Sequence, residues 1–592
     1  MSRAPQRAPK AVLGLTALAH DPAASLYIDG ELVAAVEEER LSRVKHTEAF
    51  PYRAIRFVLG EAGISFRELD CIAYYWDDRG EVLRGTQQTL RQLPTNPGGI
   101  LRVVGAQVRA SRRGPGLLRE HLAVLVDGDH EAIPPVAYFN HHETHLVAAW
   151  LSAPFEPDAA LIVDGRGEYA ATSIYQADRG PGRLAKCIES VAFPNSLGVF
   201  YGAITQVLGY EAISDEYKVM GLASYGAPDP YWDQRVGEML HIADDGRYQL
   251  NLRLFNVENC SGRELPWLNA AGMELLAGRF QGDDGRFTDA ARALAYAAQK
   301  RLEEAIIAQA QRIVRRTGAR RLVVGGGVAM NGRAIGRLRS EGLFEALHLP
   351  LAPYDAGACL GAGLAYLHQC GVGLEQGRAL RNPFLGPEYS ADSIGEMLRE
   401  CRWPFSRPAD VAADAAAEIA AGRVVGWFDG RMEFGARALG ARSILGDPRD
   451  PETRERINRS VKRRETFRPF APSVLEEACG EYFGTSCSRF MGEVVEAKPI
   501  AHERVPAVVH IDGSARPQSV PADWPVASYR RLIEAFNELT GVPMVVNTSF
   551  NVRGEPIVCS PEDALRCFAA SGLERLYLGG FRVDKQERDV SR

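Results

Sequence analysis

The sequence predicts an α/β protein. Apolar segments typical of β-strands alternate with helix-like segments along the chain, and this alternation favours an α/β fold over a helical bundle or a β-sandwich. The same order of strand, polar turn and returning strand also occurs twice, near residues 12–36 and 159–176. With 592 residues, the chain is long enough for two to four domains.

The first predicted strands lie within VLGLTALAHDPAASLYI and ELVAAV. The dipeptide between them, Asp29-Gly30, is a favoured two-residue hairpin turn. The second copy of the pattern is AALIVDGRGEYAATSIYQ. We interpret the repeat as an internal duplication.

A long amphipathic helix is predicted over residues 288–317, followed by the strand RLVVGGG and the turn VAMNG. A strand, glycines and then a helix can form a phosphate or nucleotide turn. After Leu367 the chain becomes rich in Gly, Pro and polar residues, which is typical of a connector between domains. We therefore predict a first domain over residues 1–372 and a second over residues 373–592.

The second domain is also predicted to be an α/β unit. Its segments, in order, are the helix DVAADAAAEIAAG, the strand RVVGWF, a basic stretch that ends at Arg468, the strand VPMVVNTSFN and a helix that begins at Pro561. Polar side chains that follow a strand, as in NTSFN, lie where open α/β sheets bind ligands.

Composition excludes several classes of protein. The chain is 46% hydrophobic and 24% charged, with a net charge of −6, which argues against a surface built to hold nucleic acid. It has no run of 18 apolar residues that could cross a membrane, and its basic first ten residues lead directly into a strand. We expect a cytoplasmic protein. Its ten cysteines include no CxxC pair, which favours reduced thiols.

The motif NHHETH at residues 140–145 predicts a metal site. His141 and His145 are four residues apart and therefore lie on one face of a helix, where both can bind one ion. Asp164 and Asp355 are candidate oxygen ligands because each lies at a Gly-rich corner after a strand. Two His and two Asp would suit iron, manganese or zinc. The motif lacks the HExxH order of zinc proteases.

Two further groups of residues are candidates for chemistry. The glycines at 325–327, with Asn331, allow close approach of a phosphate or ribose to the backbone, although a tight turn in the core explains them equally well. His20 is a candidate general base. Lys45 is notable because the chain has only 8 Lys among its 69 basic residues; a compact ammonium could hold an oxyanion.

A basic segment covers residues 431–468, with 11 Arg or Lys against 6 Asp or Glu. Alternating charges in RDPETRERINR are explained by a solvated helix face. Arg437, Arg442 and Arg468 have apolar neighbours, and such cations are generally held against anions. We therefore predict binding of a phosphate or carboxylate here.

Taken together, these motifs resemble the carbamoyltransferase family that includes the nodulation-factor, cephalosporin, novobiocin-type and nebramycin O-carbamoyltransferases. Matching motifs follow one another along nearly the whole chain: GLTALAHDPAASL, EEERLSRVKH, NHHETH, VDGRGE, DEYKVMGLASYG, GGGVAMNG, YDAGACLG, RMEFGARALGARSILGDPR, KRRETFRPFAPSVL, DGSARPQSV and VNTSFN.

The resemblance implies a duplicated, actin-like (ASKHA, TsaD-like) first domain and a YrdC-like second domain. In such proteins the YrdC-like domain activates carbamoyl phosphate with ATP to carbamoyl-adenylate, and the TsaD-like domain transfers the carbamoyl group to an alcohol. The implied acceptor is a hydroxylated small molecule, such as a sugar or an intermediate of antibiotic biosynthesis. Fe²⁺ or another divalent metal, and ATP with Mg²⁺, are the implied cofactors. Nucleic acid and membrane are not expected partners, and a homodimer remains open.

The resemblance also implies roles for individual residues. His20 would deprotonate the acceptor, with Lys45 nearby. The metal ligands would be His141, His145, Asp164 and Asp355. The adenylate would be bound by Lys218, Gly326, Gly327 and Asn331. Carbamoyl phosphate and ATP would be bound by Arg437, Arg442, Lys462, Arg468, Arg516, Asn547 and Ser549. Glu143, between the two histidines, leaves the ligand set open.

Three other functions compete with this interpretation. A threonylcarbamoyl-type transferase acting on tRNA would need a broad basic face, which the net charge of −6 does not favour. A non-catalytic, actin-like ligand-binding module would not need both a base and a cation cluster. A sugar kinase of the actin-like class would produce ADP in place of AMP and pyrophosphate.

Overall fold

The computed structural model describes residues 9–77, 87, 89–90, 95–178, 180, 182–260, 262–263, 265–282, 287–377, 380–465, 467–484 and 487–585. Contacts divide the chain into two compact units. The first unit runs to Glu38 and resumes over His46–Arg381, and the second comprises Glu39–Lys45 and the chain from Asn382. The division falls a little after the predicted boundary at residue 372. No sequence pattern indicates that Glu39–Lys45 belongs to the second unit.

The first unit begins with a five-stranded sheet in the order β3-β2-β1-β4-β5. Strands β1, β2 and β3 pair antiparallel, whereas β1, β4 and β5 pair parallel. The Asp29-Gly30 turn joins β2 to β3 with both residues at positive φ, 50° and 86°, as a type I′ hairpin turn requires. The strands are β1 Ala11–Thr16, β2 Ala23–Ile28, β3 Glu31–Glu37, β4 Cys71–Tyr74 and β5 Val136–Tyr138.

A second sheet in the same unit repeats this topology, in the order β8-β7-β6-β11-β12. Strands β6, β7 and β8 pair antiparallel, and β6, β11 and β12 pair parallel. The strands are β6 Ala159–Val163, β7 Ala170–Ala177, β8 Ala185–Ala192, β11 Arg321–Gly325 and β12 Ala346–His348. The predicted duplication is therefore confirmed, because both sheets share strand order and strand directions.

Two helices, α5 (His141–Ser152) and α12 (Asp355–Gln369), pack against each other, and α12 also packs against β1. Glycines permit the close contact. A methyl group at Gly361 would lie 1.9 Å from the Thr144 carbonyl oxygen, and one at Gly14 would lie 2.0 Å from the Cys359 carbonyl oxygen. The backbones therefore approach more closely than any other residue would allow.

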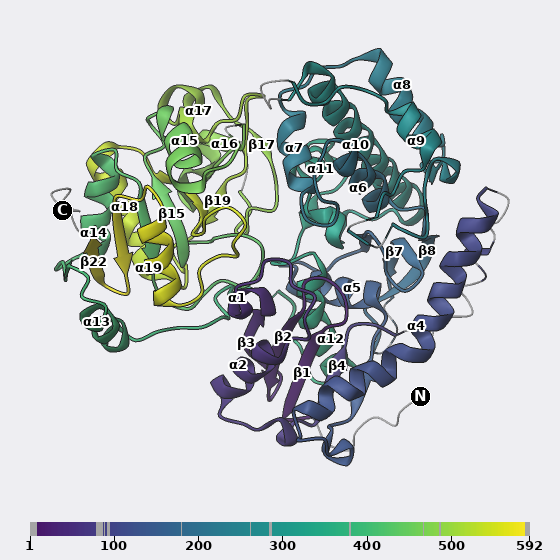
Figure 1. Ribbon diagram of the computed structural model, residues 1–592, viewed down its shortest axis with the longest axis horizontal. Coiled ribbons are helices and arrows are strands. Elements are labelled where there is room, and N and C mark those ends of the chain that lie inside the picture. Colours follow the sequence, from purple (N-terminus) through teal and green to yellow (C-terminus); the bar gives the residue numbers. More distant parts are fainter. Residues whose placement is uncertain are drawn as a thin grey trace. The chain divides into compact units, whose positions relative to one another are not determined.

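The predicted helix over residues 288–317 is α10 (Asp289–Thr317), which Thr288 caps at its start and Gly318 ends at φ 66°. Figure 1 shows α10 among the helices of the first unit, where it packs against α7, α8 and α11. The other helices and short strands of this unit are α2 Tyr52–Ala62, α4 Pro97–Val124, α6 Leu197–Val207, α7 Glu216–Ala223, α8 Pro230–Met239, α9 Ala270–Leu275, α11 Gly332–Ser340, β9 Leu240–Ile242 and β10 Tyr248–Leu250.

The second unit is built on one mixed sheet of eight strands, in the order β13-β22-β21-β14-β15-β20-β16-β19. Parallel pairs, β14 with β21 and β16 with β19, interrupt an otherwise antiparallel arrangement. The strands are β13 Phe405–Ser406, β14 Val425–Phe428, β15 Arg442–Gly446, β16 Ala471–Leu475, β19 Gln518–Val520, β20 Met544–Ser549, β21 Arg575–Leu578 and β22 Phe581–Asp584. The predicted α/β fold class is confirmed in both units.

Helices surround this sheet (Figure 1). They are α13 Ala391–Glu400, α14 Val411–Ala420, α15 Glu452–Arg456, the π-helix Ile457–Lys462, α16 Cys479–Phe483, α17 Pro499–Arg504, α18 Ala527–Thr540 and α19 Pro561–Ala570. A separate pair of strands consists of β17 Val495–Glu496 and β18 Ser514–Ala515. The predicted helices near residue 411 and from Pro561 correspond to α14 and α19. Within the described part of the chain, no helix has both the length and the apolar character needed to span a membrane.

The segment Glu39–Lys45, which includes most of α1 (Glu38–Ser42), is held in the second unit by two arginines. Arg40 donates a hydrogen bond to the Gly435 carbonyl at 2.9 Å. Arg43 donates to the Pro556 carbonyl at 3.0 Å, and its Nε lies 3.3 Å from Asp563 Oδ2. These partners are far away in sequence, so local patterns could not predict them.

Candidate functional site

Three elements of the first unit bring the four predicted metal ligands together. His141 and His145 lie one turn apart on α5, Asp164 directly follows β6, and Asp355 is the first residue of α12. One ligand atom from each residue lies within 4.8 Å of those from the other three. All four side chains are buried. The sequence therefore identified all members of this cluster.

The distances within the cluster are short. His145 Nε2 lies 3.0 Å from Asp164 Oδ2, and His141 Nε2 lies 3.1 Å from the same oxygen. The two Nε2 atoms are 3.1 Å apart. Asp355 Oδ1 lies 3.6 Å from His141 Nε2 and 3.8 Å from His145 Nε2. Four buried donors thus converge on one small volume.

Electrostatics also fit a cation in this cluster. Burial alone would lower the pKa of His145, but the carboxylates of Asp164 and Asp355 raise that pKa to about 9. Burial would raise the pKa of Asp164, yet hydrogen bonds from the two imidazoles hold it well below its usual range. Two buried carboxylates require positive charge beside them, which a divalent ion held by imidazoles and carboxylates could supply.

The other residues of NHHETH do not join the cluster. Glu143 is exposed to solvent and is not one of the four converging residues, which answers the question that its position in the motif raises. His142 Nδ1 lies 2.8 Å from Ser173 Oγ. Burial lowers the pKa of His142 to about 3, so this ring is neutral.

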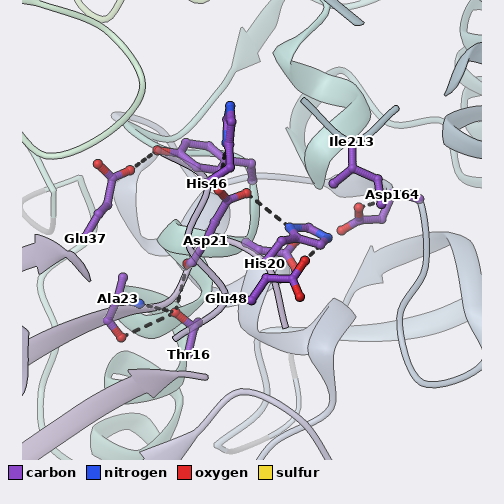
Figure 2. A network of polar contacts seen from close by, with 12 residues as sticks. Thr16, His20, Asp21, Ala23, Glu37, His46, Glu48, Asp164 and Ile213 are labelled. Atoms are coloured by element: carbon purple, nitrogen blue, oxygen red, sulfur yellow. Dashed lines mark hydrogen bonds and ion pairs between the residues drawn. The ribbon is translucent and has the colours of Figure 1, made fainter. Parts of the chain in front are cut away.

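His20, the candidate base, lies beside the cluster. Figure 2 shows its ring next to Asp21 and near Asp164. His20 Nδ1 lies 3.1 Å from Asp21 Oδ2, and His20 Nε2 lies 3.8 Å from Asp355 Oδ2. Asp21 also approaches His46, at 3.6 Å between Oδ1 and Nδ1. Asp21 therefore fixes the orientation of the His20 ring. Lys45 belongs to the second unit, and its role near His20 stays a prediction.

The predicted glycine turn lies against the metal cluster. Gly326 has φ 90°, and a methyl group there would lie 2.3 Å from the Val163 carbonyl oxygen. A methyl group at Gly327 would lie 3.1 Å from Asp164 Oδ1. Only glycine can therefore occupy position 326, and the turn places Gly327 beside Asp164.

The other residues expected to bind the adenylate have partners within the first unit. Asn331 Oδ1 caps α11 by accepting from the Ala334 N–H at 3.1 Å, and the Asn331 amide also pairs with Gln299. Lys218 Nζ lies 2.7 Å from Asp215 Oδ2. Contact of Asn331, Lys218 and the glycine turn with an adenylate stays a prediction.

In the second unit, Lys462 is a buried cation at the end of the π-helix. Its Nζ donates to Asn551 Oδ1 at 2.6 Å, to Ser549 Oγ at 3.2 Å and to the Ser549 carbonyl. Burial lowers the pKa of Lys462 well below its usual value, and Arg464 and Arg468 lower it further. The structure thus brings together two of the predicted residues, Lys462 and Ser549.

Arg516 lies among other arginines. Burial lowers its pKa well below the usual value, and Arg437, Arg464 and Arg468 contribute in the same direction. We call Arg437, Lys462, Arg464, Arg468 and Arg516 the cation cluster. The sequence analysis missed Arg464, which lies in the matched motif KRRETFR. Such a concentration of positive charge is suited to a polyanion.

Arg442 differs from the cation cluster. Its guanidinium is fully buried and donates to the carbonyls of Pro387, Asp429, Gly430 and Ala441 at 3.0–3.3 Å. It also stacks on the Phe428 ring, with 3.5 Å between its Cζ and the ring centroid. These contacts give Arg442 a structural role, and its contact with carbamoyl phosphate or ATP stays a prediction.

Asn547 lies inside the sheet and supports the loop that carries Arg437. Its Nδ2 donates to the Ala438 carbonyl at 3.0 Å and to Ser473 Oγ at 2.9 Å. Gln518 Nε2 donates to the next carbonyl of the loop, that of Leu439, at 3.0 Å. Asn547, Ser473 and Gln518 are all buried. Sequence reasoning missed Ser473 and Gln518, although both lie in matched motifs.

Two family models together match most of this chain. The family model described as Carbamoyltransferase N-terminus matches residues 11–364, and that described as Carbamoyltransferase C-terminus matches residues 416–585. An uncharacterized protein of Synechocystis sp. is 36% identical over 606 residues, covering 97% of this chain and 96% of that protein. Nodulation protein NolNO of Sinorhizobium fredii is 36% identical over 580 residues, covering 96% and 79%. Nodulation protein NolO of Bradyrhizobium diazoefficiens is 36% identical over 460 residues, covering 76% and 79%.

Proposed function

This chain belongs to the carbamoyltransferase family, and on that premise we propose that it is an ATP-dependent O-carbamoyltransferase. Carbamoyl phosphate and ATP are its substrates, carbamoyl-adenylate is its intermediate, and a hydroxyl of a small molecule is its acceptor. The observation that carries the proposal is the presence, in one chain, of a buried cluster of two His and two Asp and of a separate cluster of five cations.

The cation cluster of the second unit is the proposed site of activation. Carbamoyl phosphate loses its phosphate to water, which leaves carbamate and inorganic phosphate. A carbamate oxygen then attacks the α-phosphorus of ATP, carbamoyl-adenylate forms and pyrophosphate leaves. Both steps move negative charge onto phosphate oxygens, which the buried cations Lys462 and Arg516 and their neighbours stabilise. ATP would enter with Mg²⁺, which bridges its phosphates.

The first unit is the proposed site of transfer. A divalent metal held by the four clustered residues would polarise the carbamoyl carbonyl as a Lewis acid. Burial would lower the pKa of His20, but Asp355 and Asp21 raise it to about 10, so the ring is protonated unless a cation in the cluster offsets these carboxylates. With such a cation bound, His20, oriented by Asp21 at 3.1 Å, would be neutral and would accept the proton of the acceptor hydroxyl. The hydroxyl oxygen bonds to the carbamoyl carbon as the bond to AMP breaks, and AMP leaves. The glycine turn at Gly326 holds the adenylate beside Asp164.

The donor set narrows the choice of metal. Two imidazoles and two carboxylates suit iron, manganese or zinc better than Mg²⁺ or Ca²⁺, which prefer oxygen ligands alone. We propose Fe²⁺ as the resident ion. Metal analysis of protein purified without chelators identifies the ion directly.

The test is to incubate the protein with ATP, ¹³C-carbamoyl phosphate and a panel of hydroxylated sugars, aminoglycosides, polyketides and β-lactams. We expect AMP and pyrophosphate to form together with one product that carries the ¹³C-carbamoyl group, identified by mass. ADP as the nucleotide product would contradict the proposal and indicate a kinase. A parallel incubation with ATP, threonine, ¹³C-bicarbonate and tRNA tests the alternative: label on the tRNA there, with no labelled small molecule in the first mixture, would indicate a threonylcarbamoyl-type transferase.

A further inference from the structure

Glu168 connects two parts of the first unit that carry metal ligands. It lies in the turn between β6 and β7, shortly after Asp164. One carboxylate oxygen, Oε1, accepts from the backbone N–H of His141 at 2.8 Å and from that of Asp77 at 2.9 Å. The other, Oε2, accepts from Asn140 Nδ2 at 2.8 Å. Each of these three groups donates an N–H to Glu168.

Two of these hydrogen bonds fix the start of α5. The first N–H groups of a helix have no partner within the helix, and Glu168 accepts one of them, that of His141. Asn140 Oδ1 accepts a second one, the backbone N–H of Glu143, at 3.3 Å. Glu168 Oε2 in turn accepts a hydrogen bond from Nδ2 of the same Asn140 side chain. A negative charge at a helix start is also favourable to the helix dipole. The position of α5, and of its two imidazoles, therefore depends on Glu168.

The partner segment carries a third ligand. Asp164 and Glu168 belong to the same β6–β7 turn, and the Gly165 N–H donates to Asp164 Oδ1 at 2.6 Å. Strand β6 belongs to the second copy of the duplicated fold, whereas α5 directly follows the last strand of the first copy. Glu168 thus joins the two copies at the point where their ligands meet.

We propose that Glu168 is a positioning residue of the metal site, which holds the two histidines of α5 in register with Asp164. The inference rests on the metal site of the proposed function. Residues that orient ligands without touching the metal typically contribute a factor of about 10 to 100 in metal affinity. Glutamine at this position has the same shape, but its NH₂ group would replace one of the two accepting oxygens. That NH₂ group would then face an N–H donor.

The experiment measures the affinity of the full-length, metal-free protein for Zn²⁺, by competition with a colorimetric chelator. Zn²⁺ is a suitable probe because it accepts the same imidazole and carboxylate ligands. We expect Glu168→Gln to lower the affinity by about 10- to 100-fold. Glu143→Gln is the matched control, because Glu143 lies on the same helix, is exposed and does not join the cluster; its affinity should equal that of the wild type.

Circular dichroism of the metal-free variants checks that they fold. If Glu168→Gln does not fold, Glu168→Asp takes its place, since it keeps the charge but shortens the reach, and it should also bind Zn²⁺ more weakly than the wild type. Wild-type affinity in a folded Glu168 variant, or an equal loss in Glu143→Gln, would overturn the role of Glu168. A wild-type protein that binds no Zn²⁺ would overturn the metal site itself, and the role of Glu168 with it.

Discussion

Among individual residues, Lys462 is a buried lysine whose surroundings disfavour its charged ammonium form. Burial and the neighbouring Arg464 and Arg468 lower its pKa well below the ordinary value of 10.5. A bound anion would act in the opposite direction, because negative charge beside the ammonium raises its pKa. Binding of an anion and binding of a proton are therefore linked at this residue.

The first prediction follows from that linkage. Between the lowered pKa of Lys462 and its higher pKa in the complex, binding of an anion takes up a proton, so affinity should fall as pH rises through this window. Calorimetry of ATP binding in buffers with different heats of ionisation counts the protons taken up. We expect net uptake in the wild type and less uptake in Lys462→Met. Equal uptake in both proteins would show that another group is responsible.

The second prediction separates two arginines that the sequence treats alike. Arg442→Ala leaves buried carbonyls without donors and should lower the free energy of unfolding by about 3 kcal/mol. Arg437→Ala should change that free energy by less than about 1 kcal/mol, yet abolish formation of pyrophosphate. Urea unfolding and a pyrophosphate assay on both variants test the distinction. Similar stability losses in the two variants would contradict it.

At the scale of the element, the glycine turn after β11 is shaped by a clash that only glycine avoids. Gly326 has φ 90°, and a methyl group there would lie 2.3 Å from the Val163 carbonyl oxygen. Gly318, which ends α10, also has positive φ, at 66°, but no atom lies within 4 Å of the place of its methyl group. A side chain at Gly318 would therefore meet backbone strain alone, whereas one at Gly326 would meet both backbone strain and a steric clash.

The third prediction uses this pair. Gly318→Ala should lower the free energy of unfolding by about 1 kcal/mol, because alanine disfavours positive φ. It should leave metal binding unchanged. Gly326→Ala should also displace the turn that lies against Asp164, and so lower Zn²⁺ affinity at least about tenfold. Chelator competition and thermal unfolding measure the two effects. Unchanged Zn²⁺ affinity in Gly326→Ala would show that the turn does not support the metal cluster.

Local patterns predicted much of the fold and site, and tertiary contacts account for the rest. The spacing of His141 and His145 already determines that they share a helix face, so that part of the metal site could be read from the sequence. The role of Arg442 could not, because it depends on carbonyls that the fold brings to its guanidinium, including that of Pro387. Glu168 was overlooked for the same reason, since its donors come from Asp77, Asn140 and His141.

The duplication and the second unit illustrate the same limit. Two similar hairpin patterns were enough to predict the repeated sheets, because each hairpin is local. The segment Glu39–Lys45 continues directly from β3, yet Arg43 ties it to Pro556 and Asp563 in the second unit. A boundary drawn from composition alone cannot detect a segment that crosses between units in this way.

Across the whole molecule, the proposed reaction is divided between two units. The cation cluster belongs entirely to the second unit, and the metal cluster with His20 belongs entirely to the first. Because no residue is shared between the two clusters, variants in one should leave the chemistry of the other intact.

The most direct test is pyrophosphate release from ATP, measured with and without carbamoyl phosphate in three proteins. We expect the wild type to release pyrophosphate only when carbamoyl phosphate is present. His141→Ala should lose metal but still release pyrophosphate in its first turnover. Arg437→Ala should keep metal but release no pyrophosphate. Pyrophosphate release without carbamoyl phosphate would contradict the proposed activation step. Loss of the release in His141→Ala together with its retention in Arg437→Ala would contradict the division of activation and transfer between the two units.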